Sequence, residues 1–210
     1  IYFYIKSKIL MKIIFDWLLQ NWLEVSATLL SLVYLYCSVK QNILLWLFGL
    51  ISSALFIYVY FHAGFYADMS LQVYYVFVSI YGWIHWLHGG TNNTSLKVSK
   101  SSNKILILCL LASILLWVAI YCILKLTDST VPIGDSFTTA AAIVATWMLA
   151  RKLLENWLFW VVIDFVSLLL YIYKELWATS ILFLVYTVVA IVGYFKWKKD
   201  MNTFSQSDSN

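Results

Sequence analysis

The chain has 210 residues, of which 63% are hydrophobic and 11% are charged, and its mean hydropathy is +0.83. Soluble globular domains are about 45–50% apolar and about 25% charged, so the composition excludes that class and indicates an all-α integral membrane protein in a lipid bilayer. The formal net charge of +4 comes from basic residues at the ends of apolar segments and gives no indication of a nucleic-acid partner.

The N-terminal segment, 1–21, precedes the first apolar span. Because the chain opens on Ile1, we expect Met11 to be the functional start. The segment has lysines and a short apolar run but no small-residue cleavage site, so it does not have the pattern of a signal peptide.

Seven apolar segments of membrane-spanning length follow. Three lie in a first repeat, 22–90, one lies in a linker, 91–134, and three lie in a second repeat, 135–197. Asp135 is predicted to be the N-cap of the fifth span, and the polar tail, 198–210, is predicted to be disordered. The expected spans are 22–39, 43–61, 69–87, 104–124, 136–150, 156–173 and 176–195.

The basic residues at the span ends predict the orientation. One side of the membrane has few of them, namely Lys125, Lys174 and the N-terminal lysines, and the opposite side has more. Because cytoplasmic loops are enriched in lysine and arginine, the richer side should be cytoplasmic, with the N-terminus outside and the C-terminus inside a bacterial inner membrane. The richer side holds Lys40, Lys97, Lys100, Lys104, Arg151, Lys152, Lys196, Lys198 and Lys199.

The two groups of three spans are related by an internal repeat. An ungapped shift of 111 residues places Trp46 on Trp157 and Trp86 on Trp197, with 11 identities over the 47 aligned positions that begin at Lys40. This predicts two parallel three-helix repeats joined by one connecting helix. In carriers built from parallel repeats, the substrate binds near the middle of the membrane between the halves.

The sixth span carries the strongest candidate for a binding site. On a helix, Trp157, Trp160 and Asp164 fall within one narrow arc, and Tyr171 extends it. A carboxylate deep in a membrane costs about 3 kcal/mol or more, so it normally faces a cavity or a partner. Aromatic faces beside a carboxylate suit a flat cationic ring. Alternatively, the tryptophans pack at a helix interface and Asp164 bonds to a neighbouring helix.

The third span contributes a second polar face that includes Gln72 and Tyr75. Within an apolar span, Gln72 needs a partner, which is either a ligand amide or a neighbouring helix. Trp86, near the end of this span, is expected to be an interfacial tryptophan. The cysteines Cys37, Cys109 and Cys122 lie in apolar stretches without metal-site spacing, so we expect buried thiols and neither a disulfide, a metal nor a cofactor.

These residues resemble the Pnu family of vitamin transporters, whose best-known members are the PnuC nicotinamide riboside transporters. The resemblance covers about Trp22 to Trp197. Its most specific parts are Gln72 and the block Glu155-Asn156-Trp157-Leu158-Phe159-Trp160. Other matching blocks are Trp22-Leu23-Glu24, Gly49-Leu50, Leu55-Phe56, Tyr66-Ala67 and Tyr81-Gly82-Trp83.

The resemblance implies seven core helices in a three-plus-one-plus-three arrangement, like that of the SWEET sugar transporters. It implies facilitated diffusion of an unphosphorylated vitamin, made one-way by a cytoplasmic kinase, and a possible homotrimer. It also places Gln72, Trp157, Trp160 and Asp164 at the substrate, and Tyr75, Ser52, Ser53 and Tyr171 complete the candidate set.

Two positions depart from the riboside pattern, because Asp164 and Ser52 stand where asparagine is usual. A carboxylate accepts hydrogen bonds but cannot donate them, and it would suit the amine of an aminopyrimidine. Nicotinamide riboside is therefore the first expected substrate and thiamine the alternative. A membrane receptor or assembly factor that transports nothing is a third hypothesis. The sequence does not indicate an enzyme, because no catalytic dyad, metal-ligand set or large soluble domain is present.

Overall fold

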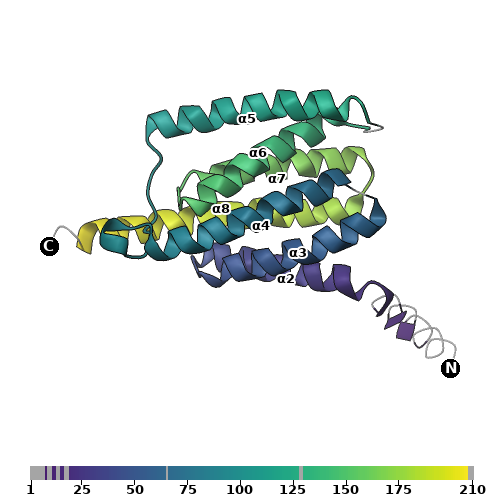
Figure 1. Cartoon of the computed structure of the whole chain (residues 1–210), viewed down its shortest axis with the longest axis horizontal. Coiled ribbons are helices and arrows are strands. Elements are labelled where there is room, and N and C mark those ends of the chain that lie inside the picture. The colour runs from purple at the N-terminus through teal and green to yellow at the C-terminus, as the bar shows by residue number, and fades with distance from the viewer. Residues whose placement is uncertain are drawn as a thin grey trace. The chain divides into compact units, whose positions relative to one another are not determined.

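The described chain is almost entirely helical, as expected for backbone that must satisfy its own hydrogen bonds in lipid. The computed structural model describes residues 8, 11–12, 15–16, 19–64, 66–127 and 130–207. The named helices of this part are α2 (Trp22–Val39), α3 (Leu44–Ala63), α4 (Tyr66–His88), the short 3-10 helix η1 (Thr91–Asn93), α5 (Asn103–Leu124), α6 (Pro132–Ala150), α7 (Asn156–Tyr173) and α8 (Trp177–Ser207) (Figure 1).

Five of these helices are long and apolar enough to cross a membrane: α3, α5, α6, α7 and the Thr179–Thr203 part of α8. Helix α2 adds a shorter apolar segment, Val25–Val39. Together they confirm the prediction of an all-α integral membrane protein. The predicted bounds of the first and sixth spans agree with those of α2 and α7 to the residue.

Two predicted boundaries are wrong. Asp135 is not an N-cap, because α6 begins one turn earlier at Pro132, whose fixed backbone angle suits the first turn of a helix. The tail predicted to be disordered is helical as far as Ser207, because α8 continues to that residue. Lys196 and Asp200 stabilise the extension by an ion pair of 3.4 Å between residues one turn apart. Residues 208–210 of the predicted disordered tail lie outside the described residues.

The helix bounds are consistent with the predicted repeat. A shift of 111 residues carries both ends of α2 and α3 and the start of α4 to within one residue of those of α6, α7 and α8, and α8 then continues eight residues beyond the shifted end of α4. The backbone turns also correspond. Gln41 and Lys152 both adopt left-handed conformations, with φ of 54° and 55°, and so do Gly64 and Glu175, with φ of 77° and 58°. Helix α5 is the connector between the two repeats.

The contacts divide the chain into two compact units. The first contains the described residues up to Cys37 and Leu44–Ile80, and the second contains Ser38–Ile43 and the described residues from Tyr81 onward. Inside the first unit, the Ser52 hydroxyl donates to the carbonyl of Ala27 at 2.9 Å and lies 2.7 Å from the Ser31 hydroxyl. These bonds join α3 to α2.

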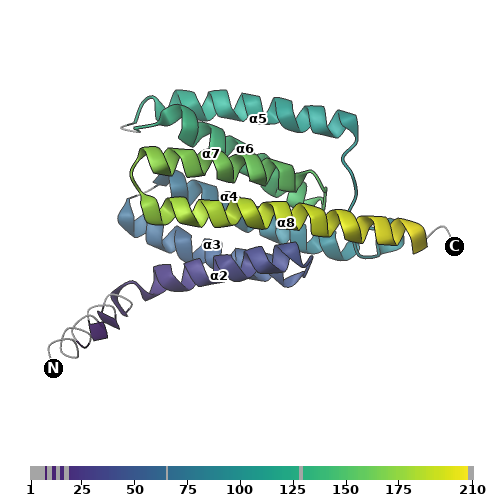
Figure 2. The same ribbon diagram turned by 180° about the vertical axis from the view of Figure 1, so that it is seen from behind.

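In the second unit, α5 packs on α6, α6 on α7, and α7 on α8 (Figures 1 and 2). Small residues let the neighbours of α6 approach closely, as is common for membrane helices: Ala140, Ala141, Ala142, Ala145 and Ala150 are buried. Helix α5 is mostly exposed, so Cys122 is exposed rather than buried, whereas Cys37 and Cys109 are buried.

Helices α7 and α8 approach each other closely at Trp157 and Gly193. A Cβ atom added at Gly193 would lie 2.7 Å from two ring carbons of Trp157. The indole cannot retreat easily, because only 2% of Trp157 is exposed and its ring meets the ring of Trp197 edge to face at 5.5 Å. Glycine at this position therefore allows the two helices to pack around a tryptophan.

Gly193→Ala should lower the melting temperature of the purified protein. Alanine favours a helix over glycine by about 1 kcal/mol, but overpacking a rigid site costs about 1–3 kcal/mol, so the clash should prevail. Val192→Ala is the control, because Val192 is 53% exposed on the same helix. A melting temperature of Gly193→Ala equal to or above that of the parent protein would show that Trp157 can move.

Candidate functional site

The candidate site is built on α7, around the buried side chain of Asp164. This residue is 6% exposed, and no described residue forms a hydrogen bond or ion pair with its carboxylate. Tyr186 of α8 lies near enough to interact with it electrostatically. A buried carboxylate without a partner is costly, so this position is suited to a ligand that supplies a positive charge or a hydrogen-bond donor.

Two further polar groups without partners lie at the start of α7. Asn156 is fully buried, and its amide donates to the Leu153 carbonyl, while its side-chain oxygen has no hydrogen-bond partner among the described residues. The indole N–H of Trp157 is also buried and without an acceptor in this part of the chain. Buried polar atoms in native structures are nearly always paired, so each of these atoms is a candidate contact for a bound molecule.

The other aromatic residues of α7 have protein neighbours. Trp160 packs against the buried cluster of Ala141, Ala142, Ala145 and Ile163, which joins α6 to α7. Tyr171 stacks on Phe183 at 5.0 Å, and Phe183 meets the ring of Tyr186 edge to face at 5.7 Å. A row of three aromatic rings therefore runs from Tyr171 through Phe183 to Tyr186, which interacts electrostatically with Asp164.

The remaining predicted site residues belong to the first unit. Gln72 and Tyr75 are partly buried on α4. Ser53 is 6% exposed and Ser52 is 4% exposed on α3. The Ser52 hydroxyl is engaged in the α2–α3 contact described above, which is a sufficient structural reason for a polar residue at that position.

One end of the second unit gathers many of the basic residues that the sequence assigns to one side of the membrane. Lys152 Nζ donates to the Leu96 carbonyl at 2.8 Å and lies 4.4 Å from the centre of the Trp86 ring. Burial lowers the pKa of Lys152 to about 8. The backbone N–H of Ser101 donates to Glu155 at 2.8 Å, and Gln41 donates to Asp200 at 2.8 Å. We call the group of residues 38–43, 85–102, 149–155 and 196–200 the basic end.

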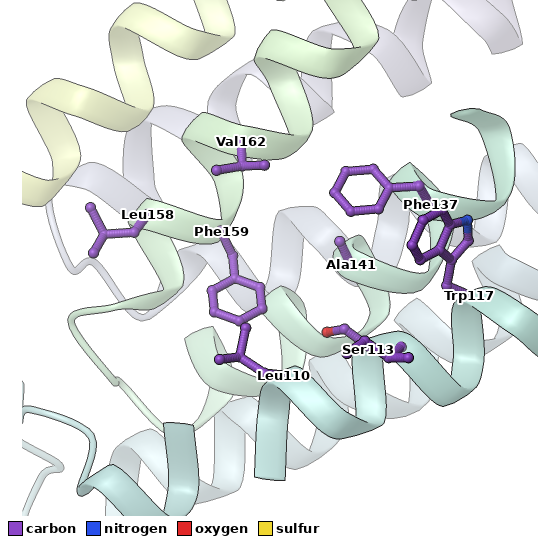
Figure 3. A pocket seen from close by; sticks show the side chains of 9 residues that line it. Leu110, Ser113, Trp117, Phe137, Ala141, Leu158, Phe159 and Val162 are labelled. Atoms are coloured by element: carbon purple, nitrogen blue, oxygen red, sulfur yellow. The ribbon is translucent and has the colours of Figure 1, made fainter. Parts of the chain in front are cut away.

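The apolar cavity between α5, α6 and α7 does not have the chemistry of a vitamin site (Figure 3). Its volume is about 310 Å³. The one hydroxyl in its lining, that of Ser113, donates to the carbonyl of Cys109 within its own helix. Nothing there would recognise a carboxamide or a charge. The lining is Leu110, Ser113, Ile114, Trp117, Phe137, Ala141, Leu158, Phe159 and Val162.

Sequence reasoning missed Tyr186 and Asn156 as candidates. Tyr186 is aligned with Tyr75 by the repeat, and this pairing was a usable signal, because Tyr75 was already a candidate. Asn156 stands at the first position of α7, where an asparagine is easily interpreted as a helix cap. Its unpaired side-chain oxygen becomes evident only when the surrounding residues are placed.

Comparisons with known proteins agree with this fold. The family model described as "Nicotinamide mononucleotide transporter" matches residues 21–199. The chain is 26% identical over 203 residues to the nicotinamide riboside transporter PnuC of Escherichia coli K12, with 84% of this chain and 85% of that protein covered. It is 25% identical over 198 residues to the nicotinamide riboside transporter PnuC of Neisseria mucosa, with 86% and 73% covered.

A solved structure has the same fold. The crystal structure of the vitamin B3 transporter PnuC matches with a TM-score of 0.69 and 23% identity, and the match covers 92% of this chain and 88% of that one. The family model spans most of the sequence, and the relatives are transporters. The chain therefore belongs to the nicotinamide mononucleotide transporter family, as a multi-pass inner-membrane transport protein and not an enzyme.

Proposed function

We propose that this protein takes up an unphosphorylated, positively charged vitamin, with nicotinamide riboside as the first substrate, by facilitated diffusion. A cytoplasmic kinase then traps the vitamin as its phosphate. The observation that carries the proposal is the buried carboxylate of Asp164, which has no partner among the described residues. The pyridinium ring of nicotinamide riboside supplies the positive charge that this carboxylate lacks.

The negative charge of Asp164 argues against the phosphorylated mononucleotide named in the family description. A 5′-phosphate would bring about −1.5 to −2 charge into a site that already holds a carboxylate. From residue 19 onward, the described lysines and the arginine lie at helix ends, in the segments between helices or after residue 195, so none of them lies deep in a spanning helix to balance that charge. Like charges in a medium of low dielectric constant repel strongly, so the riboside should be preferred.

The aromatic residues supply the remaining recognition. Trp157 and Trp160 carry flat faces that attract a cationic ring, and the unpaired N–H of Trp157 can donate to a ligand oxygen. Tyr171 belongs to the aromatic row that leads to Tyr186. Gln72, Tyr75, Ser52 and Ser53 stay predictions for substrate binding.

Thiamine is the second candidate because of the same residue. Its aminopyrimidine amine donates hydrogen bonds, and Asp164, unlike asparagine, only accepts them. Thiamine is also a cation, so the charge alone does not distinguish the two vitamins. The substitution Asp164→Asn, which replaces the carboxylate by an amide of the same shape, should therefore affect the binding of the two vitamins differently.

The orientation follows from the basic end. Because basic residues concentrate on the cytoplasmic side, we propose that the basic end faces the cytoplasm, with the N-terminus outside and the C-terminus inside. The homotrimer implied by the family resemblance also stays a prediction, and the oligomeric state can be measured by light scattering in detergent.

A tag fused to the C-terminus should be accessible only from the cytoplasm, and one fused at Met11 only from outside. Proteolysis of the tags in intact cells and in inverted vesicles measures this directly. Two tags on the same side would contradict the odd number of spans.

Asp164→Ala should weaken vitamin binding by about 1–3 kcal/mol, the cost of losing a charge-assisted bond. Asp164→Asn should impair thiamine binding more than nicotinamide riboside binding, and Trp157→Ala and Trp160→Ala should weaken both through lost stacking. Calorimetric titration of both vitamins into each purified variant measures these effects. Ser167→Ala is the control, because Ser167 is a buried polar residue of the same helix that is not assigned to the site.

If Asp164→Ala lowers only the yield and the melting temperature while binding is unchanged, Asp164 has a structural role. If neither vitamin binds the unmodified protein, the substrate proposal fails whatever the variants do. Nicotinamide mononucleotide belongs in the same titrations, and binding of it as tight as that of the riboside would contradict the charge argument.

A further inference from the structure

Two tryptophans, one from each repeat, form equivalent hydrogen bonds at the basic end. Trp86 of α4 donates its indole N–H to the Leu149 carbonyl near the end of α6, at 3.2 Å. Trp197 of α8 donates to the Ser38 carbonyl near the end of α2, at 3.1 Å. Both the donors and the acceptors are related by the shift of 111 residues. Each repeat therefore holds the last turn of the first helix of the other repeat.

These bonds are buried, and they are in contact with each other. Trp86 is 3% exposed and Trp197 is fully buried, so Trp86 is not the interfacial residue that its position near the end of the span predicted. The two indole rings meet edge to face at 6.0 Å. The side chains of Gln41 and Asp200 also join the first repeat to the second, by a hydrogen bond of 2.8 Å.

One of the two tryptophans also touches the candidate site. The ring of Trp197 packs edge to face on Trp157, with 5.5 Å between the ring centres. A ligand that contacts Trp157 would therefore also act on the ring of Trp197, whose N–H forms the bond to Ser38.

We propose that the reciprocal Trp86–Leu149 and Trp197–Ser38 bonds form a latch that closes the basic end and opens once in each transport cycle. The inference rests on the proposed transport function. A carrier of this architecture exposes its site to one side at a time by moving one repeat against the other, so contacts that join the repeats at a closed end must break when that end opens. Trp197 is then the positioning residue that connects the latch to the substrate.

Chemical cross-linking across the latch tests whether this end opens. In a background with Cys37, Cys109 and Cys122 replaced by serine, the Gln41→Cys/Asp200→Cys variant is treated with a short bis-methanethiosulfonate reagent. Counterflow of labelled nicotinamide riboside in proteoliposomes should stop after cross-linking and return after reduction. The Lys196→Cys/Asp200→Cys variant is the matched control, because it places the same chemistry within α8 alone and should transport normally.

Transport that continues at the same rate through fully cross-linked Gln41→Cys/Asp200→Cys protein would overturn the latch. Binding distinguishes this failure from a failure of the proposed function. A protein that binds the riboside in calorimetry and exchanges it despite the cross-link refutes the latch alone. A reduced protein that neither binds nor exchanges the riboside refutes the proposed function, and the latch is then decided by an experiment that needs no substrate.

Native Cys37 provides that experiment, because it directly precedes Ser38 and is 6% exposed. In a Cys109→Ser/Cys122→Ser background, Trp86→Phe and Trp197→Phe should each raise its rate of maleimide labelling by about fivefold, the effect of losing one hydrogen bond on an opening equilibrium. Trp147→Phe, a change at a partly exposed tryptophan of α6 outside the latch, is the control. Unchanged labelling in both latch variants would overturn the proposal.

The same two variants test the connection to the substrate. Trp197→Phe should weaken riboside binding several-fold and more than Trp86→Phe does, because Trp197 packs directly on Trp157. Equal effects of the two substitutions on binding would show that the latch acts without a link through Trp157.

Discussion

A carboxylate buried among apolar helices has few ways to be stable: it can bind a proton, pair with a cation, or meet a ligand. Asp164 has no cationic partner among the described residues, and its described electrostatic neighbour is the phenol of Tyr186. The surrounding structure depends on this constraint. Helices α7 and α8 carry aromatic rings in the turns near the acid, among them Trp160 and Tyr186. The proposed role of the second unit, to receive a positive charge, rests on this constraint.

Tryptophan has two separate roles in this arrangement. Trp157 brings a broad apolar face and an unpaired N–H to the start of α7, where Gly193 makes room for its ring. Trp86 and Trp197 use their N–H groups to hold the Leu149 and Ser38 carbonyls near the ends of other helices, and each carbonyl also accepts a backbone N–H, from Lys152 and Gln41 respectively. The large ring surface suits a membrane helix, and the single donor fixes its orientation. The proposed recognition of substrate and the joining of the repeats thus use the same residue type.

Much of the fold could be predicted because apolar runs bounded by polar residues mark membrane spans directly. The bounds of α2 and α7 and the repeat followed from that pattern. The start of α6 did not, since Pro132 marks a loop as readily as a first turn, and neither did the helical tail, whose polar composition hides the Lys196–Asp200 pair. Placing Trp157, Trp160 and Asp164 on one face needed only helical periodicity. Their neighbours Trp197 and Tyr186 lie on the next helix, and periodicity within one helix cannot find them.

The turn between α7 and α8 suggests a way to raise the thermal stability of this protein. Glu175 adopts a left-handed backbone conformation with φ of 58°, and the equivalent position of the first repeat is Gly64. A residue with a side chain is strained there by about 1 kcal/mol or more, whereas glycine is not. The first repeat is thus a template for the second: copying its glycine into an exposed turn away from Asp164 and the latch is a route to a more heat-resistant protein for crystallisation. Because equivalent turns of the two repeats share a backbone conformation, a residue that fits a turn in one repeat is a candidate substitution at the equivalent turn of the other.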